Sequence, residues 1–314
     1  MSLQTEKPIG VIYEHAPEFN PVLTELSKRG IPWTVIDPSD HYYNPALTDV
    51  PYRLIVNDMS NPPYTSRTVQ GTTLALDYTR HLEQTSIPRI QGRLLNSAYT
   101  IGILANKSHQ LSVFAAQGLR FPVTRIINSL EQLLAASSEL TFPLLIRPNK
   151  SWTNLPPLRI NSITELIEAF AGDYIYLDRT ESILVQSFVA SKHDHIVRVE
   201  TINGNVQHAV RIYQAGDSLG NWPLEVKVEH FKPNADIVQT VEALARAARL
   251  DIGAIEYTID RKTDAVTFLG IRPHTTSYSI GIDGVDQQET SLSDAIAQYI
   301  VYRLGKVREL ELAL

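Results

Sequence analysis

The stretch Ile196-Val-Arg-Val-Glu-Thr-Ile-Asn-Gly-Asn-Val-Gln-His-Ala-Val-Arg-Ile-Tyr213 decides the fold of the second half of the chain. It holds two runs of β-forming residues, 196–202 and 206–213, on either side of Asn203-Gly204. Asn and Gly tolerate the positive φ that a two-residue hairpin turn needs, so this dipeptide between β runs is a strong hairpin signal. The stretch therefore predicts two antiparallel strands.

Further strands and helices flank this hairpin on both sides. Apolar runs that predict strands lie at 142–147, 183–189, 252–259 and 266–271. Helical spacing of apolar residues marks 97–117, 129–137, 162–170, 238–250 and 291–304. Ser162 followed by Glu165 is a capping box that begins one of these helices. The pattern predicts a small α+β unit over 101–182 and a larger one over 183–314.

The first hundred residues alternate between strand and helix. Runs at 8–13, 33–36 and 52–57 read as buried strands, and Asn20–Arg29 between the first two has helical spacing that Gly30 ends. Such alternation is typical of an open parallel sheet. We therefore expect an α/β domain over residues 1–100.

Composition narrows the class of protein. The chain has 314 residues, 43% of them hydrophobic and 20% charged, which is a globular balance. A net charge of -6 and a pI of about 5.9 argue against an extended nucleic-acid interface. Zero cysteines exclude thiolate chemistry, and no apolar run is long enough to span a membrane. Met1–Lys7 lacks the apolar segment of a signal peptide, so we expect a cytoplasmic protein that acts on a small substrate.

Six motifs in one order give the chain a family resemblance. They are Ala105-Asn-Lys107 with Gly118-Leu-Arg-Phe-Pro-Val-Thr124, Phe142-Pro-Leu-Leu-Ile-Arg-Pro148, Leu184-Val-Gln-Ser-Phe-Val189, Val197-Arg-Val with the hairpin to Ala209-Val-Arg211, Gly253-Ala-Ile-Glu256, and Phe268-Leu-Gly-Ile-Arg-Pro273. In order and spacing these resemble the ATP-grasp superfamily from Pro8 to Tyr302. The fifth and sixth stand where the family has its "GvD" and "lEvNp" strands, and Ala209-Val-Arg211 where it has "A-x-x-R".

The resemblance implies a fold and an activity. The fold is an N-terminal pre-grasp α/β domain at 1–100, a small ATP-grasp lobe at 101–182 and a large one at 183–314, with ATP held between the lobes. The activity is ATP-dependent ligation of a carboxylate to an amine or thiol through an acyl-phosphate, on a small molecule or peptide, with magnesium at the phosphates. The sequence is also compatible with a homodimer.

The same resemblance assigns roles to individual residues. Lys107 and Arg147 stand at the family positions that contact the phosphates, and Gln186, Phe188 and Val189 at those that contact adenine. Arg198 and Arg211 stand at the positions near the transferred phosphate and the substrate carboxylate. Glu256 stands at the position of the first magnesium ligand. Asn221 matches an asparagine near the family's substrate loop.

Several positions depart from the family pattern. Gly270 and Arg272 replace two metal ligands, and an arginine there could itself bind an anion. The loop Asn149–Leu158, expected to approach phosphates through glycine amides, has no glycine. Ser187 replaces a glutamate, and Asp58 stands where an arginine is usual. These departures leave open an alternative, a catalytically degenerate protein that binds a nucleotide or another anion as a binding or regulatory subunit.

Each site residue also has a plainer interpretation. Lys107 could be a solvated helix lysine and Arg147 a surface arginine at a strand end. Arg198 and Arg211 could pair across strands with carboxylates such as Glu200. His193 and His195 point to one side of a strand as a zinc pair would, but without a third ligand an exposed polar turn is favoured. We expect Asp283, Asp286 and Glu289 to be solvated.

Overall fold

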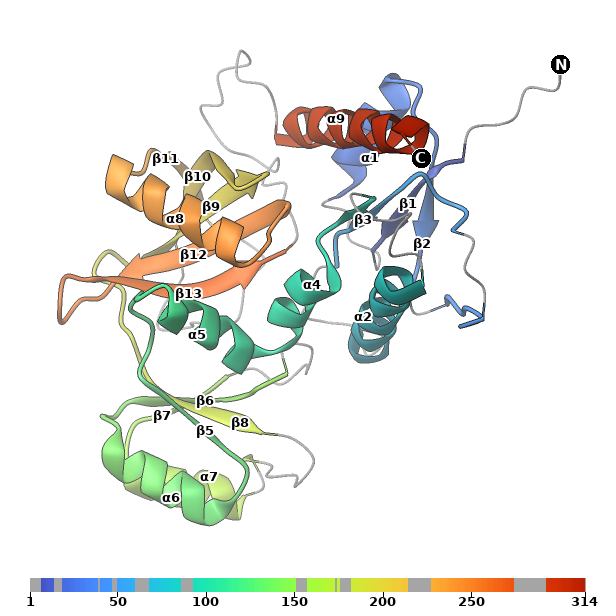
Figure 1. Cartoon of the computed structure of the whole chain (residues 1–314). Coiled ribbons are helices and arrows are strands. Elements are labelled where there is room, and N and C mark those ends of the chain that lie inside the picture. The colour runs from blue at the N-terminus through green and yellow to red at the C-terminus, as the bar shows by residue number, and fades with distance from the viewer. Residues whose placement is uncertain are drawn as a thin grey trace, which may run out of the picture.

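The computed structural model describes residues 7–13, 19–38, 40–46, 50–59, 68–85, 93–150, 157–172, 174–175, 182–213, 227–273 and 292–313. In this part of the chain three sheets follow one another, and Figure 1 shows them as three separate layers. Elements below are labelled as in that figure. No helix among the described residues combines the length and the apolar character that crossing a membrane would require.

The first sheet is parallel, as the alternating pattern predicted. Its strands are β1 (Ile9–Ile12), β2 (Trp33–Ile36), β3 (Leu54–Asn57) and β4 (Leu94–Leu95), in the order β2-β1-β3-β4. The accompanying helices are α1 (Asn20–Lys28), α2 (Thr68–Thr85) and α4 (Ala98–Ala105). Ser97 caps α4 by accepting a hydrogen bond from the Thr100 amide.

The last helix packs against the first sheet. Helix α9 (Leu292–Ala313) lies beside α1, at the opposite end of the chain, as Figure 1 shows. Its apolar residues Ile296, Ile300 and Leu304 are buried in one core with Val11 and Leu26. Arg29 at the end of α1 also pairs with Asp294 of α9. The C-terminal segment therefore ties the large lobe to the N-terminal domain.

The small lobe is an antiparallel sheet with two helices on one face (Figure 1). Its elements are β5 (Thr124–Ile127), α6 (Leu130–Glu139), β6 (Leu144–Pro148), β7 (Leu158–Ile160), α7 (Ile163–Ala171) and β8 (Ile183–Ser187), with strand order β5-β8-β6-β7. The Ser162 half of the capping box is present, because Ser162 Oγ accepts a hydrogen bond from the Glu165 amide at 3.1 Å. The Glu165 carboxylate accepts from the Asn161 amide, one residue before Ser162, at 2.7 Å.

The large lobe is an antiparallel sheet built on the predicted hairpin. Its elements are β9 (His195–Ile202), β10 (Asn205–Tyr213), β11 (Lys227–Phe231), α8 (Ala235–Ala247), β12 (Ile252–Ile259) and β13 (Val266–Arg272), with strand order β11-β10-β9-β12-β13. The turn residues Asn203 and Gly204 have φ of 52° and 71°, and Ile202 pairs with Asn205 across them. The hairpin prediction is confirmed. Helix α5 (Lys107–Ala116) lies against β13 and leads from the N-terminal domain toward the small lobe.

One buried asparagine joins the first sheet to the large lobe. Asn96 follows β4 with a φ of 57°, which asparagine tolerates better than most residues. Its Nδ2 donates to the carbonyls of Asn57, Ile252 and Pro273, and its Oδ1 accepts from the amides of Asp251 and Ile252. These groups come from β3, β12 and the end of β13, so one side chain fixes the position of the sheet that carries the candidate site.

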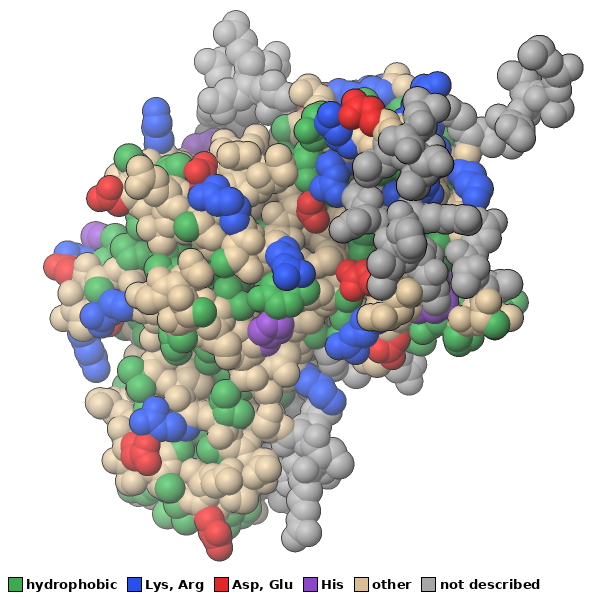
Figure 2. All heavy atoms as spheres, in the orientation of Figure 1, with side chains coloured by type: hydrophobic (Ala, Val, Ile, Leu, Met, Phe, Trp, Pro, Cys, Tyr) green, Lys and Arg blue, Asp and Glu red, His purple; other side chains and the backbone are tan. Residues whose placement is uncertain are grey.

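On the face seen in Figure 2, lysine and arginine side chains are interspersed with acidic ones rather than gathered into one basic patch.

Replacing Asn96 with alanine should destabilise the protein strongly. Several backbone groups would lose their partner, and each unpaired buried group costs about 1–3 kcal/mol. We expect a loss of at least about 3 kcal/mol in the free energy of unfolding, measured by urea denaturation. Asn205→Ala, on the exposed start of β10, is the matched control and should change it by less than about 0.5 kcal/mol. Equal effects of the two variants would contradict the bridging role.

Candidate functional site

Charged side chains gather on one face of the large-lobe sheet. Glu256 on β12 lies opposite Arg198 on β9 and opposite Gly270 on β13. Paired residues point to the same face, and so do residues two apart on a strand, so Glu200 and Arg272 share this face. The opposite face of these strands belongs to the apolar core that α5 and α8 complete. The sheet therefore separates a charged side from an apolar one.

Glu256 is at the centre of the charged face. Its Oε1 accepts a hydrogen bond from Arg198 Nη1 at 3.1 Å, and its Oε2 accepts one from Arg272 Nε at 2.9 Å. The side chain is 3% exposed. Burial alone raises the pKa of this carboxyl, but the positive charges of Arg272, Arg198 and Lys107 together outweigh burial and lower the pKa to about 2. Glu256 is therefore ionised at neutral pH, with an arginine on each oxygen.

These contacts do not fit the predicted magnesium site. Magnesium needs oxygen ligands, whereas Gly270 has no side chain and Arg272 carries a positive charge that repels a cation. Both oxygens of Glu256 already accept hydrogen bonds from arginine. Within the described ranges, no group of three or more His, Asp or Glu side chains is placed to hold a metal ion. Glu256 is the partner of two guanidinium groups here, and its assignment as a magnesium ligand stays a prediction.

Arg198 is a buried structural partner. Its Nε donates to Glu200 Oε1 at 2.7 Å, and the side chain is 2% exposed. The guanidinium is buried and held by two carboxylates, and its role at the transferred phosphate or the substrate carboxylate stays a prediction. The plainer interpretation, pairing with carboxylates of the sheet, is the one the structure shows. Arg198 holds Glu256 in place.

Arg211 lies on the other face of the sheet. It pairs with Val197 rather than with Arg198, and its guanidinium stacks on the Phe231 ring with 4.3 Å between Cζ and the ring centroid. The family pattern A-x-x-R puts the arginine on the face opposite the alanine. Here the spacing is Ala209-Val-Arg211, one residue shorter, and a shift of one residue reverses the face. Arg198 and Arg211 therefore lie on opposite faces of the sheet, and their roles at the transferred phosphate and the substrate carboxylate stay predictions.

Lys107 is a buried cation rather than a solvated one. It is the first residue of α5 and is 3% exposed. Its Nζ donates to Gln110 Oε1 at 3.1 Å. Burial first, then the charges of Arg272 and Arg147, lower the pKa of Lys107 well below its usual value, against a smaller opposing effect of Glu256. Those shifts place Lys107 within electrostatic reach of both lobes.

Gln110 holds Lys107 against the large lobe. Its Oε1 also accepts from the Ile271 amide, and its Nε2 donates to the carbonyls of Ile103 and Ile271. Gln110 was not among the site residues that the sequence predicted. A signal for it existed, because position 110 lies one helical turn after Lys107 on the same face of α5.

Arg147 extends the cluster into the small lobe. It lies near the end of β6, half-buried, and its Nε is buried with no hydrogen-bond partner in the described part of the chain. Burial first and the charge of Arg272 second lower its pKa to about 10. The Lys107 amide donates to the carbonyl of Asn149 just after β6, which brings the start of α5 to this strand. Arg147 is therefore not a simple surface residue.

The cluster carries more positive than negative charge. In the described part of the chain it has four basic side chains and two carboxylates. Its members are Lys107, Arg147, Arg198, Arg272, Glu200 and Glu256. Buried charge without a partner is costly, so an excess of cations at the junction of two lobes indicates a site for an anion. We call these six residues the charge cluster.

The hinge residues occupy the strand that joins the lobes. Gln186 Nε2 donates to Thr124 Oγ1 at 2.9 Å, and the Phe188 amide donates to the Pro143 carbonyl at 2.9 Å. The Gln186 side chain and the Phe188 amide are thus engaged within the small lobe. The contribution of Gln186, Phe188 and Val189 to adenine stays a prediction, and for Phe188 it would have to come from the carbonyl.

Other predicted residues are placed as follows. His193 and His195 stack with 5.7 Å between ring centroids. Asp58 is buried just after β3. Residues 151–156 of the glycine-free loop, Asn221, Asp283, Asp286 and Glu289 lie outside the described residues.

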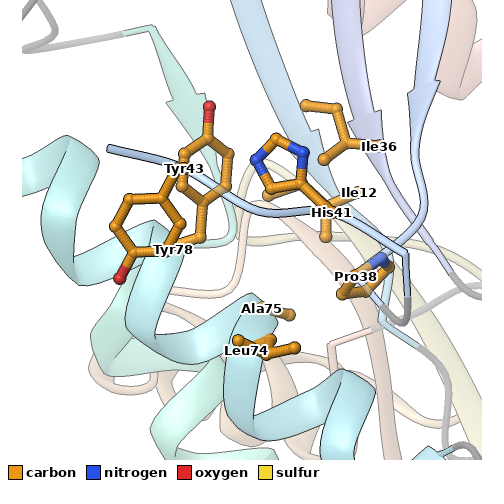
Figure 3. Close-up of a pocket in the computed structure, with 8 residues that line it drawn as sticks. All are labelled: Ile12, Ile36, Pro38, His41, Tyr43, Leu74, Ala75 and Tyr78. Atoms are coloured by element: carbon orange, nitrogen blue, oxygen red, sulfur yellow. The ribbon is translucent and has the colours of Figure 1, made fainter. Parts of the chain in front are cut away.

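A small hollow lies away from the charge cluster, at the carboxyl ends of β1 and β2, where aromatic side chains surround His41 (Figure 3). His41 packs against Tyr78 with 4.5 Å between ring centroids, and Tyr43 lies 5.0 Å from Tyr78. The space between these side chains is too small for a water molecule. Burial lowers the pKa of His41. The hollow is therefore a packed aromatic cluster, and the charge cluster is the better candidate site.

Replacing Glu256 with glutamine should destabilise the protein by about 3–5 kcal/mol, because among the described residues it leaves Arg272 without a carboxylate and the buried Arg198 with Glu200 alone. Urea denaturation at pH 7 measures the change. Glu229→Gln removes a carboxylate from an exposed pair with Lys227 and should cost no more than about 1 kcal/mol. A small effect of both substitutions would show that Glu256 does not balance the charge cluster.

The advantage of the wild type over Glu256→Gln should depend on pH. The pKa of Glu256 is about 2 in the folded protein and has an ordinary value of 4.5. A carboxyl with a lowered pKa stabilises the fold above its unfolded value and loses this contribution as pH falls toward the folded value. The difference in unfolding free energy should therefore be constant above about pH 5.5 and shrink between pH 4.5 and 2. A difference that stays constant down to pH 3 would contradict the lowered pKa.

Comparisons with known proteins agree with this architecture. No protein-family model matches the chain. The alpha-aminoadipate–LysW ligase LysX of Sulfurisphaera tokodaii is 25% identical over 180 residues, which cover 57% of this chain and 61% of the relative. The chain thus matches about three fifths of the length of that relative.

Solved structures match over nearly the whole chain. The D-cycloserine synthetase DcsG has a TM-score of 0.69 at 15% identity, covering 94% of this chain and 99% of its own. The ATP-grasp ligase PsnB, complexed with a minimal precursor, Mg and ADP, has a TM-score of 0.62 at 14% identity, covering 94% and 97%. Likeness at such identities establishes a fold. The three sheets, their order along the chain and these superpositions together show that the protein has the ATP-grasp fold.

Proposed function

We propose that the protein is an ATP-dependent ligase that joins a carboxylate to an amine through an acyl-phosphate. The observation that carries this proposal is the gathering of basic side chains where α5, β6 and β13 come together. Gln110 ties Lys107 to the Ile271 backbone next to Arg272, and the Lys107 amide donates to the Asn149 carbonyl just after the strand that carries Arg147. The proteins of like fold named above support the proposal, since LysX and PsnB are ligases and DcsG is a synthetase.

The charge cluster suits a polyphosphate better than a single small anion. Lys107 comes from the start of α5, Arg147 from the small lobe and Arg272 from the large lobe. Three cations on three elements can contact successive phosphates, and arginine can bind two oxygens of one phosphate at once. The unpartnered Nε of Arg147 adds a buried donor that such a ligand would satisfy.

The chemistry needs little beyond positioning and charge. A carboxylate oxygen of the substrate attacks the γ-phosphorus, and the bond from that phosphorus to the β–γ bridging oxygen breaks, so ADP leaves with the electron pair. The amine nitrogen then attacks the acyl carbon, phosphate leaves, and the proton of the amine passes to solvent. In the first step negative charge builds up on the phosphoryl oxygens, and fixed cations such as Lys107 and Arg147 stabilise it.

We infer that the substrate carboxylate belongs to a small molecule or a peptide. PsnB was solved with a peptide-like partner, its minimal precursor, and DcsG acts in making a small molecule. The hinge strand with Gln186, Phe188 and Val189 would take the adenine edge through backbone groups. Phe188 itself is covered on one side by the Arg159 guanidinium, 4.4 Å from its ring centroid.

Hydroxylamine offers a test that does not need the natural amine, because it traps an acyl-phosphate as a hydroxamate. We expect the purified protein, given ATP and pools of amino acids, dicarboxylates or short peptides, to form hydroxamate and ADP with at least one pool. Lys107→Met and Arg147→Met should each lower kcat/KM by about 10–100-fold, since a hydrogen bond to a charged group contributes about 1.5–3 kcal/mol.

Matched controls separate this effect from misfolding. Lys192→Met and Arg125→Met remove exposed cations of the large and small lobes and should leave the rate unchanged. Lys107→Met should also raise the melting temperature, because it removes a buried cation that Arg147 and Arg272 repel. ADP release that does not depend on any carboxylate, or equal rates in all four variants, would contradict the ligase proposal.

A further inference from the structure

The last strand of the large-lobe sheet places a cation where a metal ligand was expected. Gly270 and Arg272 lie two apart on β13 and so share the charged face. Arg272 reaches back along the strand to Glu256, with 2.9 Å between Nε and Oε2. The guanidinium thus lies directly beside Glu256, the carboxylate that the family resemblance assigned to the metal.

Gly270 makes this arrangement sterically possible. A Cβ at position 270 would lie 3.1 Å from Glu256 Oε2 and 3.4 Å from Arg272 Nε. Both distances are tight, so even an alanine would press on the ion pair, and a glutamate would place a second carboxylate in the space of the Arg272 side chain. The two residues therefore depend on each other, because the missing side chain at Gly270 leaves the space that the Arg272 side chain occupies.

Arg272 is held in place but remains accessible. Its side chain is 22% exposed, against 3% for Glu256. In the described part of the chain its only hydrogen bond runs through Nε, which leaves both terminal nitrogens to bind a ligand. Arg198 fixes Glu256 and Glu256 fixes Arg272, so the donors are oriented before any ligand arrives. Glu256 is in this sense a positioning residue.

We propose that Arg272 takes the place of a metal ion and that Lys107, Arg147 and Arg272 bind the polyphosphate of a nucleoside triphosphate directly, without a divalent metal at this edge. The proposal rests on the proposed function for the identity of the ligand. Its physical basis is independent, because it needs only the excess of cations and the lack of oxygen ligands at β13. An arginine supplies a permanent charge and two parallel donors, which match the oxygens of one phosphate.

Isothermal titration with metal-free ligands tests the proposal directly. The probes are ATP and inorganic tripolyphosphate, each in EDTA and each in excess magnesium. For the wild type we expect binding of both probes in EDTA, with a Kd within about threefold of the value in magnesium, since the fixed cations supply the charge. Arg272→Gln should weaken binding in EDTA by at least about tenfold, which corresponds to the loss of one charge-assisted contact.

Two further variants keep the result interpretable. Arg261→Gln removes an arginine from the exposed turn before β13 and should leave both Kd values unchanged. Arg272→Lys keeps the charge but not the two parallel donors, so its Kd in EDTA should fall between those of the wild type and Arg272→Gln. Thermal melts of each variant show whether the fold is intact.

The double variant Gly270→Glu with Arg272→Asn restores oxygen ligands at β13. We expect it to bind ATP at least tenfold more tightly in magnesium than in EDTA, which is the reverse of the metal independence of the wild type. Gly270→Glu alone should be less stable than the double variant, because the new side chain meets Arg272.

Four outcomes would overturn the proposal. Two concern the wild type, which could bind ATP only with magnesium or bind neither probe. The other two are an Arg272→Gln variant that binds as tightly in EDTA as the wild type and a double variant that remains metal-independent. These outcomes are distinct from failure of the ligase proposal. Metal-free polyphosphate binding without hydroxamate formation would uphold the binding site and reject the ligase. Hydroxamate formation together with strictly magnesium-dependent binding would uphold the ligase proposal and reject metal-free binding.

Discussion

The balance of buried charge around Glu256 is the constraint on which the candidate site depends. One carboxylate with a pKa of about 2 holds two arginines, while Lys107 and Arg147 approach from other elements and form no ion pair with a carboxylate among the described residues. Burying ions costs several kcal/mol each unless they are paired, so folding leaves a strained excess of cations between the lobes. Under the proposed function an anionic ligand would relieve that excess, so the same residues that cost stability would favour binding.

The fold brings these residues together through the register of its sheets. Pairing of β9, β12 and β13 aligns Arg198, Glu256 and Gly270 in one row. Gln110 ties α5 to the Ile271 backbone and so fixes where Lys107 lies relative to this row. At the far end of β12, Asn96 and helix α9 join the large lobe to the N-terminal sheet. The site is thus anchored by backbone hydrogen bonds on rigid elements.

Patterns that act over a few residues were read correctly from the sequence. The Asn203-Gly204 hairpin, the alternating first sheet and the helix cap at Ser162 each follow from backbone geometry, and the structure confirms them. The order of motifs also indicated the fold. The face that Arg211 takes did not follow from the motif, because A-x-R and A-x-x-R look alike in a sequence and only strand pairing shows which face each arginine occupies.

By itself, the sequence determined the elements, their order and the lack of glycine and metal ligands at two key places. The tertiary structure decided which charges meet. Three features depend on contacts between residues far apart in the chain. Arg198 is fully buried between two carboxylates, Arg272 lies over Gly270 against Glu256, and Asn96 joins two sheets. Such contacts follow from strand register and side-chain burial, which local propensity does not encode, so the charge excess that points to an anion appears only once the lobes are in place.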